Sequence, residues 1–515
     1  MKQEKWHLQE QPELEAGERL MREGRREEAE ACFRKAIEAD PQNAVACANL
    51  ALILDQSGKF DEAGIFHHRA ALLDADSAEI RFNLANHLAV RDFSLARDAY
   101  LETIRLAPDH FGAWLNLGNL LFDAGYVSAA KTAYTAAATH HPGEVSPLVN
   151  LGNVHLQMEE EEEAREKFEA ALALSPDLAE AHQGLASVFH RQGEPALAVL
   201  HREKGYRPRP VFTLPAKGKG IPLLVLASSL EGNLPWRRLI DAAVFSATVV
   251  AVEYLDGVTL PEPRLIFNAI GDADLCREGL QIAASLCGRV PVINAPDAVL
   301  NTARMENAQR LSKLHGVITP GMKLFSRKES FAGPFPILVR APGFHGGNHF
   351  RMVGNPEELE SALQTMPGEE FIAMEWLDAG SPDGYFRKYR VMLVGGRLYP
   401  LHMAASRNWK VHYFSSEMAQ NPALREEEAE FLRSFESVLG KRAISALEEI
   451  GSMLGLDYGG VDFSLDGEGN LLLYEANATM SIVPPPPDPL WDYRRDAFSS
   501  VHQAARMMMT EKLYS

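Results

Sequence analysis

The sequence predicts a multidomain protein of the α plus α/β class, in which an all-helical superhelix of repeats precedes an α/β domain. Three observations support this prediction. A pattern of two amphipathic helices recurs every 34 residues through about the first 200 residues. From Ile221 onward, short apolar runs alternate with helical segments, and a β-hairpin pattern follows near the C-terminus. The expected boundaries are 1–204 for the repeats, 205–220 for a linker, 221–300 for a first α/β subdomain and 301–515 for the central and C-terminal subdomains.

The composition narrows the class of protein before any motif is considered. The 515 residues carry a net charge of −19, whereas a nucleic-acid-binding protein usually presents a basic face. No apolar run follows the N-terminal residues and no stretch of about twenty apolar residues occurs, so we expect neither secretion nor insertion into a membrane. Four cysteines lack CxxC spacing and are expected to be reduced thiols of a cytoplasmic protein: Cys32, Cys47, Cys276 and Cys287.

The helical repeats begin with a degenerate copy near Glu13 and end near Lys204. Each copy has two amphipathic helical patterns, a turn that often contains glycine, and usually a proline after the second helix. Period, turn and proline together resemble the tetratricopeptide repeat, in about six copies. The resemblance implies stacked helix pairs whose first helices line a concave binding surface. The clearest copies start at Ala48, Phe82, Leu115, Val149 and Gln183.

Asparagines recur at one position of successive first helices. Asparagine has a mediocre helix propensity, so its repetition inside helices needs a reason. A carboxamide both donates and accepts hydrogen bonds, which suits the backbone of an extended peptide. The array resembles the asparagine ladder of O-GlcNAc transferase and implies a peptide or protein substrate, while capping or contact between repeats is the alternative. The predicted peptide-binding residues are Asn49, Asn83, Asn116 and Asn150; Asn86, Asn119 and Asn153 lie one turn further on, and Gly184 interrupts the series in the last copy.

The repeat region is also the more acidic part of the chain. Residues 1–205 carry 34 acidic and 20 basic side chains, and the remainder carries 36 and 31. An acidic concave surface would attract a basic or neutral peptide.

The stretch KGYRPRPVFTLPAKGKGIP after Glu203 is rich in proline, glycine and lysine and has no helical period, which favours a linker. Beyond it, the runs PLLVLAS, ATVVAVEYL, RLIFNAI and VPVIN alternate with helical segments, which predicts a small layer of parallel strands. Polar residues at the ends of these strands, such as Asn233, Asn268 and Asp272, are candidates for substrate contact or are loop residues.

Residues 221–490 resemble the ATP-grasp ligases, beginning with VINAPDAVLNTARMENAQRLSKLHGVITP. In that family a basic residue precedes this helix, and Arg304 is the nearest candidate. The following segment, FPILVRAPGFHGGNHFRMV, is similar to the strand that bears a phosphate-binding lysine and leads into a glycine-rich loop. Here Arg340 stands where lysine is usual; it keeps the charge and can bind phosphate in bidentate fashion. The resemblance implies that ATP phosphates contact these residues and the backbone amides of Gly343, Gly346 and Gly347.

Two further blocks extend the resemblance. EEFIAMEWLDAG is similar to the family's hinge strand, which implies that Glu375 and Leu377 flank the adenine. FRKYRVMLVGGRLYPLHMAASRNWKVHY predicts a hairpin that turns at Gly395-Gly396, and the family match implies that Arg390 faces the transferred phosphate. Arg407 is the second predicted catalytic residue. It could bind the acceptor, as could His402, Lys410 and His412.

The last hairpin, in LGLDYGGVDFSLDGEGNLLLYEAN, carries three candidate metal ligands. Glu475 and Asn477 are two residues apart on one strand, and Asp462 can face them from the partner strand. Two carboxylates and a carboxamide suit Mg²⁺, whereas ordinary polar residues of a solvated hairpin are the alternative. An aspartate followed thirteen residues later by Glu-x-Asn is also the spacing of the last ATP-grasp block.

The resemblance implies an ADP-forming carboxylate–amine ligase that uses ATP and Mg²⁺. A carboxylate attacks the γ-phosphate to give an acyl phosphate, and an amine then displaces phosphate to form an amide. One of these small-molecule groups, amine or carboxylate, would be joined to the substrate that the repeats hold. Two alternatives stay open: a non-catalytic nucleotide-sensing scaffold, and a small-molecule kinase of the same fold.

Overall fold

The computed structural model describes residues 12–216, 220–329, 331–344, 349–411, 416–480, 482–485 and 488–514. The chain divides into two compact units, Met1–Pro176 with Pro215–Gly220, and Asp177–Leu214 with Ile221–Ser515. The last pair of repeat helices therefore falls in the second unit, and the domain boundaries drawn from the sequence stay predictions.

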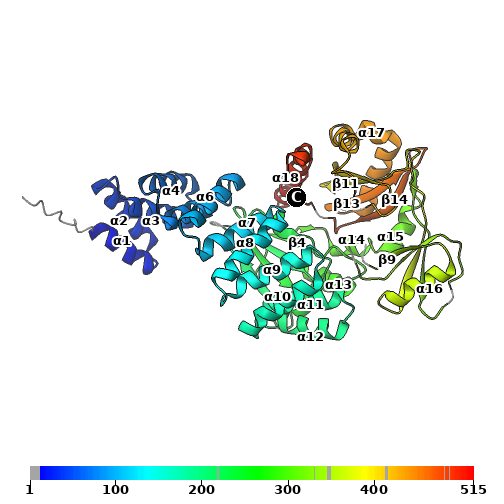
Figure 1. The fold of residues 1–515 in the computed structure, drawn as a ribbon, viewed down its shortest axis with the longest axis horizontal. Helices are drawn as coiled ribbons and strands as arrows, with labels where there is room; N and C mark the ends of the chain where they lie inside the picture. The colour runs from blue at the N-terminus through cyan, green and yellow to red at the C-terminus, as the bar shows by residue number, and fades with distance from the viewer. Residues whose placement is uncertain are drawn as a thin grey trace, which may run out of the picture. The chain divides into compact units, whose positions relative to one another are not determined.

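The predicted repeats of paired helices are present, with twelve helices in six pairs between Pro12 and Tyr206 (Figure 1). Each pair is a helix–turn–helix whose short connection makes the two helices antiparallel. The first unit contains α1 (Pro12–Arg22), α2 (Arg26–Ala39), α3 (Ala44–Gln56), α4 (Phe60–Leu73), α5 (Ala78–Leu88), α6 (Phe93–Leu106), α7 (Phe111–Asp123), α8 (Val127–His140), α9 (Val145–Gln157) and α10 (Glu161–Leu174), and the second begins with α11 (Ala179–Arg191) and α12 (Pro195–Tyr206).

Small residues on the first helix of a pair let an aromatic ring of the second helix approach closely. A Cβ atom added at Gly118 would lie 2.4 Å from the ring of Tyr134, and one added at Gly152 would lie 2.6 Å from the ring of Phe168. Both rings are almost fully buried. Glycine at this repeat position therefore sets how near the two helices pack.

The second unit contains a five-stranded sheet of order β1-β3-β2-β4-β5. Strands β2 to β5 are parallel, which agrees with the predicted layer, and β1 is an antiparallel edge. Around it lie α13 (Arg277–Leu286), α14 (Pro296–Leu300) and two 3₁₀ helices, η1 (Trp236–Arg238) and η2 (Val252–Tyr254). The strands are β1 (Val211–Leu214), β2 (Ile221–Ala227), β3 (Phe245–Ala251), β4 (Leu265–Asn268) and β5 (Val292–Ile293).

Strand β1 lies inside the stretch that the sequence indicated as linker. Four residues between two prolines, Val-Phe-Thr-Leu, pair with β3 from Val250 to Ala247. Their β-branched and aromatic side chains suit an edge strand, and proline is tolerated at its ends. Four residues flanked by proline and glycine are too few to show the alternating pattern that predicts a strand.

Two antiparallel sheets follow. The four-stranded sheet has the order β7-β10-β8-β9 and is covered by α16 (Pro356–Thr365); the five-stranded sheet has the order β12-β11-β13-β14-β6, in which β6 alone is parallel to its neighbour. Helix α15 (Arg304–Leu311) precedes them. Their strands are β6 (Val317–Ile318), β7 (Met322–Ser326), β8 (Ile337–Arg340), β9 (Phe350–Val353), β10 (Glu370–Glu375), β11 (Phe386–Val394), β12 (Arg397–Ser406), β13 (Tyr458–Leu465) and β14 (Leu471–Asn477).

Alternation along β11 and β13 gives the last sheet two different faces. Tyr389, Val391 and Phe463 pack against α17 (Pro422–Leu454), a helical stretch interrupted at Ser434 and Gly440 (Figure 1). On the other face, Met392 and Tyr458 join a core with α18 (Arg495–Lys512), which follows η4 (Pro489–Arg494). The predicted site residues Arg390 and Asp462 belong to this second face.

In the described part of the chain, no helix has the combination of length and apolar character that crossing a membrane requires.

Candidate functional site

A β-bulge places the two predicted metal-binding carboxylates on the same face of the sheet. Asp462 on β13 pairs with Glu475 on β14, whereas the next residue, Phe463, pairs with Leu473, so Tyr474 is an extra residue on β14. Leu473 packs on the α17 face, and regular alternation would place Glu475 on that face too. The extra residue reverses the alternation of side chains along β14. Glu475 therefore lies on the same face of the sheet as Asp462 and Arg390.

Asp462 is buried and held by two cations from β11. Arg390 donates to both carboxylate oxygens, at 2.6 Å from Nε to Oδ1 and 2.8 Å from Nη2 to Oδ2, and Lys388 Nζ lies 3.2 Å from Oδ2. Burial raises the pKa of Asp462, but the charges of Arg390 and Lys388 outweigh burial and hold it well below the usual range. Asp462 is therefore ionised at neutral pH.

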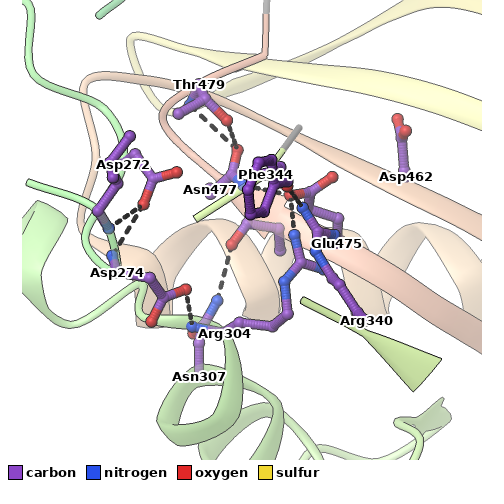
Figure 2. Close-up of polar contacts among 12 residues, drawn as sticks. Asp272, Asp274, Arg304, Asn307, Arg340, Phe344, Asp462, Glu475, Asn477 and Thr479 are labelled. Atoms are coloured by element: carbon purple, nitrogen blue, oxygen red, sulfur yellow. Dashed lines mark hydrogen bonds and ion pairs between the residues drawn. The ribbon is translucent and has the colours of Figure 1, made fainter. Parts of the chain in front are cut away.

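Glu475 is held by Arg304 and by Asn477, the predicted third metal ligand (Figure 2). Arg304 Nη2 lies 2.6 Å from Glu475 Oε1, and Asn477 Nδ2 donates to the same oxygen at 2.9 Å. The amide oxygen of Asn477 accepts hydrogen bonds from the backbone N–H and the hydroxyl of Thr479. Asn477 thus orients Glu475, and Thr479 fixes the orientation of Asn477.

Arg304 is the first residue of α15, where its backbone N–H is donated to Asp274 Oδ2 at 3.0 Å. Burial lowers the pKa of Arg304, but Glu475 and Asp274 outweigh it and raise the value. The pKa of Asp274 is raised, chiefly by burial. Asp274 therefore anchors the start of the helix that carries Arg304.

Arg340 stands at the end of β8 and has a different environment. Its guanidinium donates to the backbone carbonyl of Phe344 (Figure 2). Burial, followed by the positive charge of Arg304, lowers its pKa to about 10. A cation at this position is destabilised unless an anion comes near it.

The loop after β8 is held by the last repeat helices, which belong to the same compact unit. His190 of α11 lies 3.2 Å from the carbonyl oxygen of Gly343, and its ring stacks on Phe344 with centroids 5.8 Å apart. Next to it, Arg191 forms an ion pair of 2.8 Å with Glu231. His190 therefore holds the segment that follows Arg340.

These side chains line a cavity of about 290 Å³ between the four-stranded sheet and the last sheet. Its lining combines charged side chains with aromatic and apolar ones. The charged lining residues are Arg304, Arg340, Glu375, Lys388, Arg390, Lys410, Asp462 and Glu475, and the other lining residues are Pro320, Leu338, Phe350, Met374, Trp376, Leu377, Ala379, Phe386, Trp409, Val411 and Tyr474.

Some predicted site residues lie elsewhere. Arg407 is exposed over the ring of Tyr385 and does not line the cavity. His402 is buried on β12, and burial, with the charge of Arg390, lowers its pKa well below the usual value. Gly343 contacts His190 rather than the cavity. Gly346, Gly347 and His412 fall outside the described residues.

Sequence reasoning missed Lys388 and the aromatic lining of the cavity. The spacing of Lys388 and Arg390 on one strand carries the signal, because residues two apart on a strand share a face. Trp376 and Trp409 were found within motifs but without a role; their rings lie 5.7 Å apart at 87° and form one corner of the cavity. An aromatic residue directly after a predicted hinge strand is the feature that points to it.

The asparagines of the repeats form hydrogen-bonded steps between neighbouring copies. Asn116 Nδ2 donates to Asn86 Oδ1 at 2.9 Å, and Tyr100 donates its hydroxyl to the same oxygen. The step recurs in the next copy, where Asn150 Nδ2 donates to Asn119 Oδ1 at 3.1 Å and Tyr134 donates its hydroxyl to it.

The predicted set of four asparagines is therefore not uniform. Asn116 and Asn150 have such a partner in the preceding copy, whereas Asn49 and Asn83 make no such bond among the described residues. For Asn83 the reason is that Leu52 occupies the position corresponding to Asn86. In the later copies these asparagines therefore form contacts between repeats, which was the alternative to peptide binding. The amide oxygens of Asn116 and Asn150 stay available as acceptors.

Family models described as tetratricopeptide repeats match residues 20–81 and 86–145, and a model described as TPR repeat matches residues 145–193. The N-terminal region of about 200 residues thus consists of tetratricopeptide repeats, which fit protein or peptide partners. The three matches lie within the first 193 residues.

Similar proteins share this repeat region. The chain is 26% identical over 148 residues to Tetratricopeptide repeat protein 8 of Caenorhabditis elegans. The matched residues make up 28% of this chain and 29% of that protein. It is 30% identical over 138 residues to Protein O-mannosyl-transferase TMTC3 of Homo sapiens, over 26% of this chain and 15% of that protein. The chain spans less than a third of either relative.

A solved structure of Pseudomonas aeruginosa PilF is also similar. It is 19% identical, covers 39% of this chain and 91% of its own, and has a TM-score of 0.35.

Proposed function

We propose that the protein is an ATP-dependent, ADP-forming ligase that makes an amide bond through an acyl phosphate, with the repeats holding a peptide or protein substrate. The observation that carries the proposal is the cavity between the two antiparallel sheets. Five cations and three carboxylates line it together with aromatic and apolar side chains. Such a lining offers cations to a triphosphate and aromatic rings to a purine.

Two features of the cavity lining support nucleotide binding. The pKa of Arg340 is lowered by burial and by Arg304, so this cation gains stabilisation from a nearby phosphate. At the end of β10, Glu375 donates its backbone N–H to Gly321, while among the described residues the N–H of Leu377 makes no hydrogen bond. Leu377 can therefore donate to the adenine edge, and the rings of Trp376 and Trp409, which meet edge to face, would lie beside the base.

The donor set fits Mg²⁺ in its chemistry. Asp462 and Glu475 are paired residues of β13 and β14, Asn477 follows on β14, and Mg²⁺ takes one or two carboxylates together with phosphate oxygens. Glu475 lines the cavity with a side chain 30% exposed and would be the first ligand, with Asp462 and Asn477 supporting it. Bound Mg²⁺ would neutralise charge on the phosphates.

The chain's own residues then serve two steps. In the first, a substrate carboxylate oxygen forms a bond to the γ-phosphorus and the bond to ADP breaks; Arg390 and Lys388 stabilise the negative charge of the transferred group. In the second, an amine attacks the acyl carbon, inorganic phosphate leaves and the amine loses a proton. No side-chain nucleophile is needed for either step.

The repeats support a peptide as one substrate. Asn116 and Asn150 donate their amide N–H groups to the preceding copy. Their amide oxygens can therefore accept hydrogen bonds from the backbone N–H groups of a peptide. The acidic balance of residues 1–205 favours a basic or neutral peptide.

One observation favours a second function, a non-catalytic nucleotide-sensing scaffold. All three candidate metal ligands are engaged within the protein, Asp462 by Arg390, Glu475 by Arg304 and Asn477 by Thr479. A site of this kind could bind nucleotide phosphates through its arginines without turnover.

Product analysis separates these functions. The full chain is incubated with ATP, Mg²⁺, basic peptides and free amino acids, and nucleotides and peptide masses are resolved. We expect ADP together with a peptide that has gained an amino acid less water, and we expect Glu475→Ala to abolish both while the repeats stay folded.

Other outcomes contradict the ligase. A stable phosphate ester with ADP indicates a kinase, and AMP indicates a different activation chemistry. Binding of ATP without formation of ADP across the panel supports the sensing scaffold. Unchanged turnover in Glu475→Ala removes the metal assignment.

A further inference from the structure

Two histidines and an aspartate converge between the second and third repeats. His67 of α4 lies with Nε2 2.9 Å from Asp55 Oδ2, and His87 of α5 lies with Nδ1 2.8 Å from Asp55 Oδ1. Asp55 stands near the end of α3, so the three side chains come from three successive helices. Both imidazoles are almost fully buried, while the Asp55 side chain is 23% exposed.

The geometry suits a metal ion. One nitrogen from each ring and one carboxylate oxygen lie within 4.8 Å of one another. Two imidazoles and one carboxylate are a donor set that zinc and its neighbours in the first transition series accept, and three protein ligands leave a fourth position for water. Mg²⁺ and Ca²⁺ prefer oxygen donors and fit this set poorly.

We propose that Asp55, His67 and His87 bind a divalent transition-metal ion of the Zn²⁺ class, which fastens the third repeat to the second. The exposed edge of Asp55 gives the ion access from solvent. The site lies in the first unit, apart from the residues assigned to ATP.

Local sequence builds this site in one repeat pair. Gly64 of α4 leaves room for His87, because a Cβ there would lie 3.0 Å from Nε2. Two copies further on, His155 lies one residue beyond the position that corresponds to His87 and pairs with Glu160 at 2.6 Å, but no second histidine joins them among the described residues. His155 with Glu160 is therefore a histidine–carboxylate pair without a complete donor set.

The competing explanation is that the two histidine–Asp55 hydrogen bonds only join the helices, and two substitutions separate this role from metal binding. His67→Gln and His87→Asn keep an N–H donor close to the atom that faces Asp55, but an amide nitrogen does not bind Zn²⁺. Both substitutions therefore preserve the hydrogen bonds to Asp55 and remove a metal ligand. His155→Asn is the matched control.

The full chain, stripped of metal with a chelator, is titrated with Co²⁺ and with Zn²⁺, and bound metal is counted after gel filtration. We expect one equivalent of Zn²⁺, intense visible absorption of tetrahedral Co²⁺, and a higher unfolding temperature with Zn²⁺. His67→Gln and His87→Asn should weaken binding at least about tenfold and abolish the absorption. His155→Asn should behave as the unchanged chain, and all variants should keep the same far-UV circular dichroism.

Two results would overturn the proposal. One is the absence of bound metal and of any absorption in the unchanged chain. The other is equal metal content in the unchanged chain and in both histidine variants, which would place the ion elsewhere.

Discussion

The ion pair between Arg390 and Asp462 fixes how the charged side chains of the candidate site are arranged. Asp462 is the shared anion of Arg390 and Lys388, and all three lie in or beside a largely buried sheet face. Removing one member of a buried pair costs more than the pair contributes, because an uncompensated charge is left behind.

Asp462→Asn should therefore destabilise the second unit by about 3 kcal/mol. Urea unfolding of the full chain, followed by tryptophan fluorescence, measures this loss. Glu468→Gln, in the exposed turn of the same hairpin, should change stability by less than about 0.5 kcal/mol. Equal unfolding midpoints for the two variants would show that Arg390 finds another counter-charge.

His402 predicts a pH dependence at the residue scale. It is buried, and Arg390, Lys388 and Arg494 act with burial to lower its pKa, against the opposing effect of Asp462. The unfolded chain binds a proton near pH 6.5, and the folded chain does not. Stability is thus lost as pH falls below about 6.5, by up to about 1.4 kcal/mol per pH unit.

His402→Gln should flatten the fall in stability between pH 7.5 and pH 5.5, measured by urea unfolding at each pH. His315→Gln, at an exposed position of the same unit, should leave the slope unchanged. The same slope in His402→Gln and in the unchanged chain would mean that this histidine is not the group responsible.

Residue positions in the site were more predictable than their contacts. The spacing of Asp462 and Glu475 suggested that they share a face, and they do. The physical cause, a bulge at Tyr474, has no local sequence signal that alternation could reveal, because Leu471 and Leu473 imply the opposite phase. Lys388 was missed because its partner, Asp462, is distant in sequence.

At the scale of elements, the packing of three helix pairs, α1/α2, α7/α8 and α9/α10, depends on glycine facing an aromatic ring. Gly118 on α7 faces Tyr134 on α8, and a Cβ there would meet the ring at 2.4 Å. A buried ring between helices has little room to move, so the helices would have to shift.

Gly118→Ala should destabilise the repeat unit by about 1–3 kcal/mol, measured by thermal unfolding followed by circular dichroism. Gly143→Ala is the matched control, since a Cβ there meets nothing within 4 Å. A stability change no larger in Gly118→Ala than in this control would contradict the packing account.

The helices were predictable because a 34-residue period repeats one signal six times. The sheets were less so. Pairing of β13 with β11, and of β6 with β14, joins segments far apart in sequence, and only the hairpin turns at Gly395 and Gly469 marked neighbours locally. Strand β1 shows the limit most clearly, since four residues between prolines carry no usable period.

At the scale of the whole molecule, tetratricopeptide repeats, which fit protein or peptide partners, and the cavity that we propose to bind nucleotide occupy one chain. The last helix pair belongs to the unit that holds the cavity, and His190 contacts the loop that Arg340 also contacts. The last pair of repeat helices therefore contacts the loop that follows Arg340.

The central claim is that this cavity binds ATP, and calorimetric titration of the full chain with ATP and Mg²⁺ tests it most directly. Arg340→Met removes a destabilised cation without leaving a buried carboxylate unpaired, so the protein should stay folded and lose about tenfold to hundredfold in affinity. Arg407→Met, outside the cavity, should bind ATP as the unchanged chain does. The absence of binding in the unchanged chain, or equal affinity in Arg340→Met, would contradict the assignment of the cavity to nucleotide.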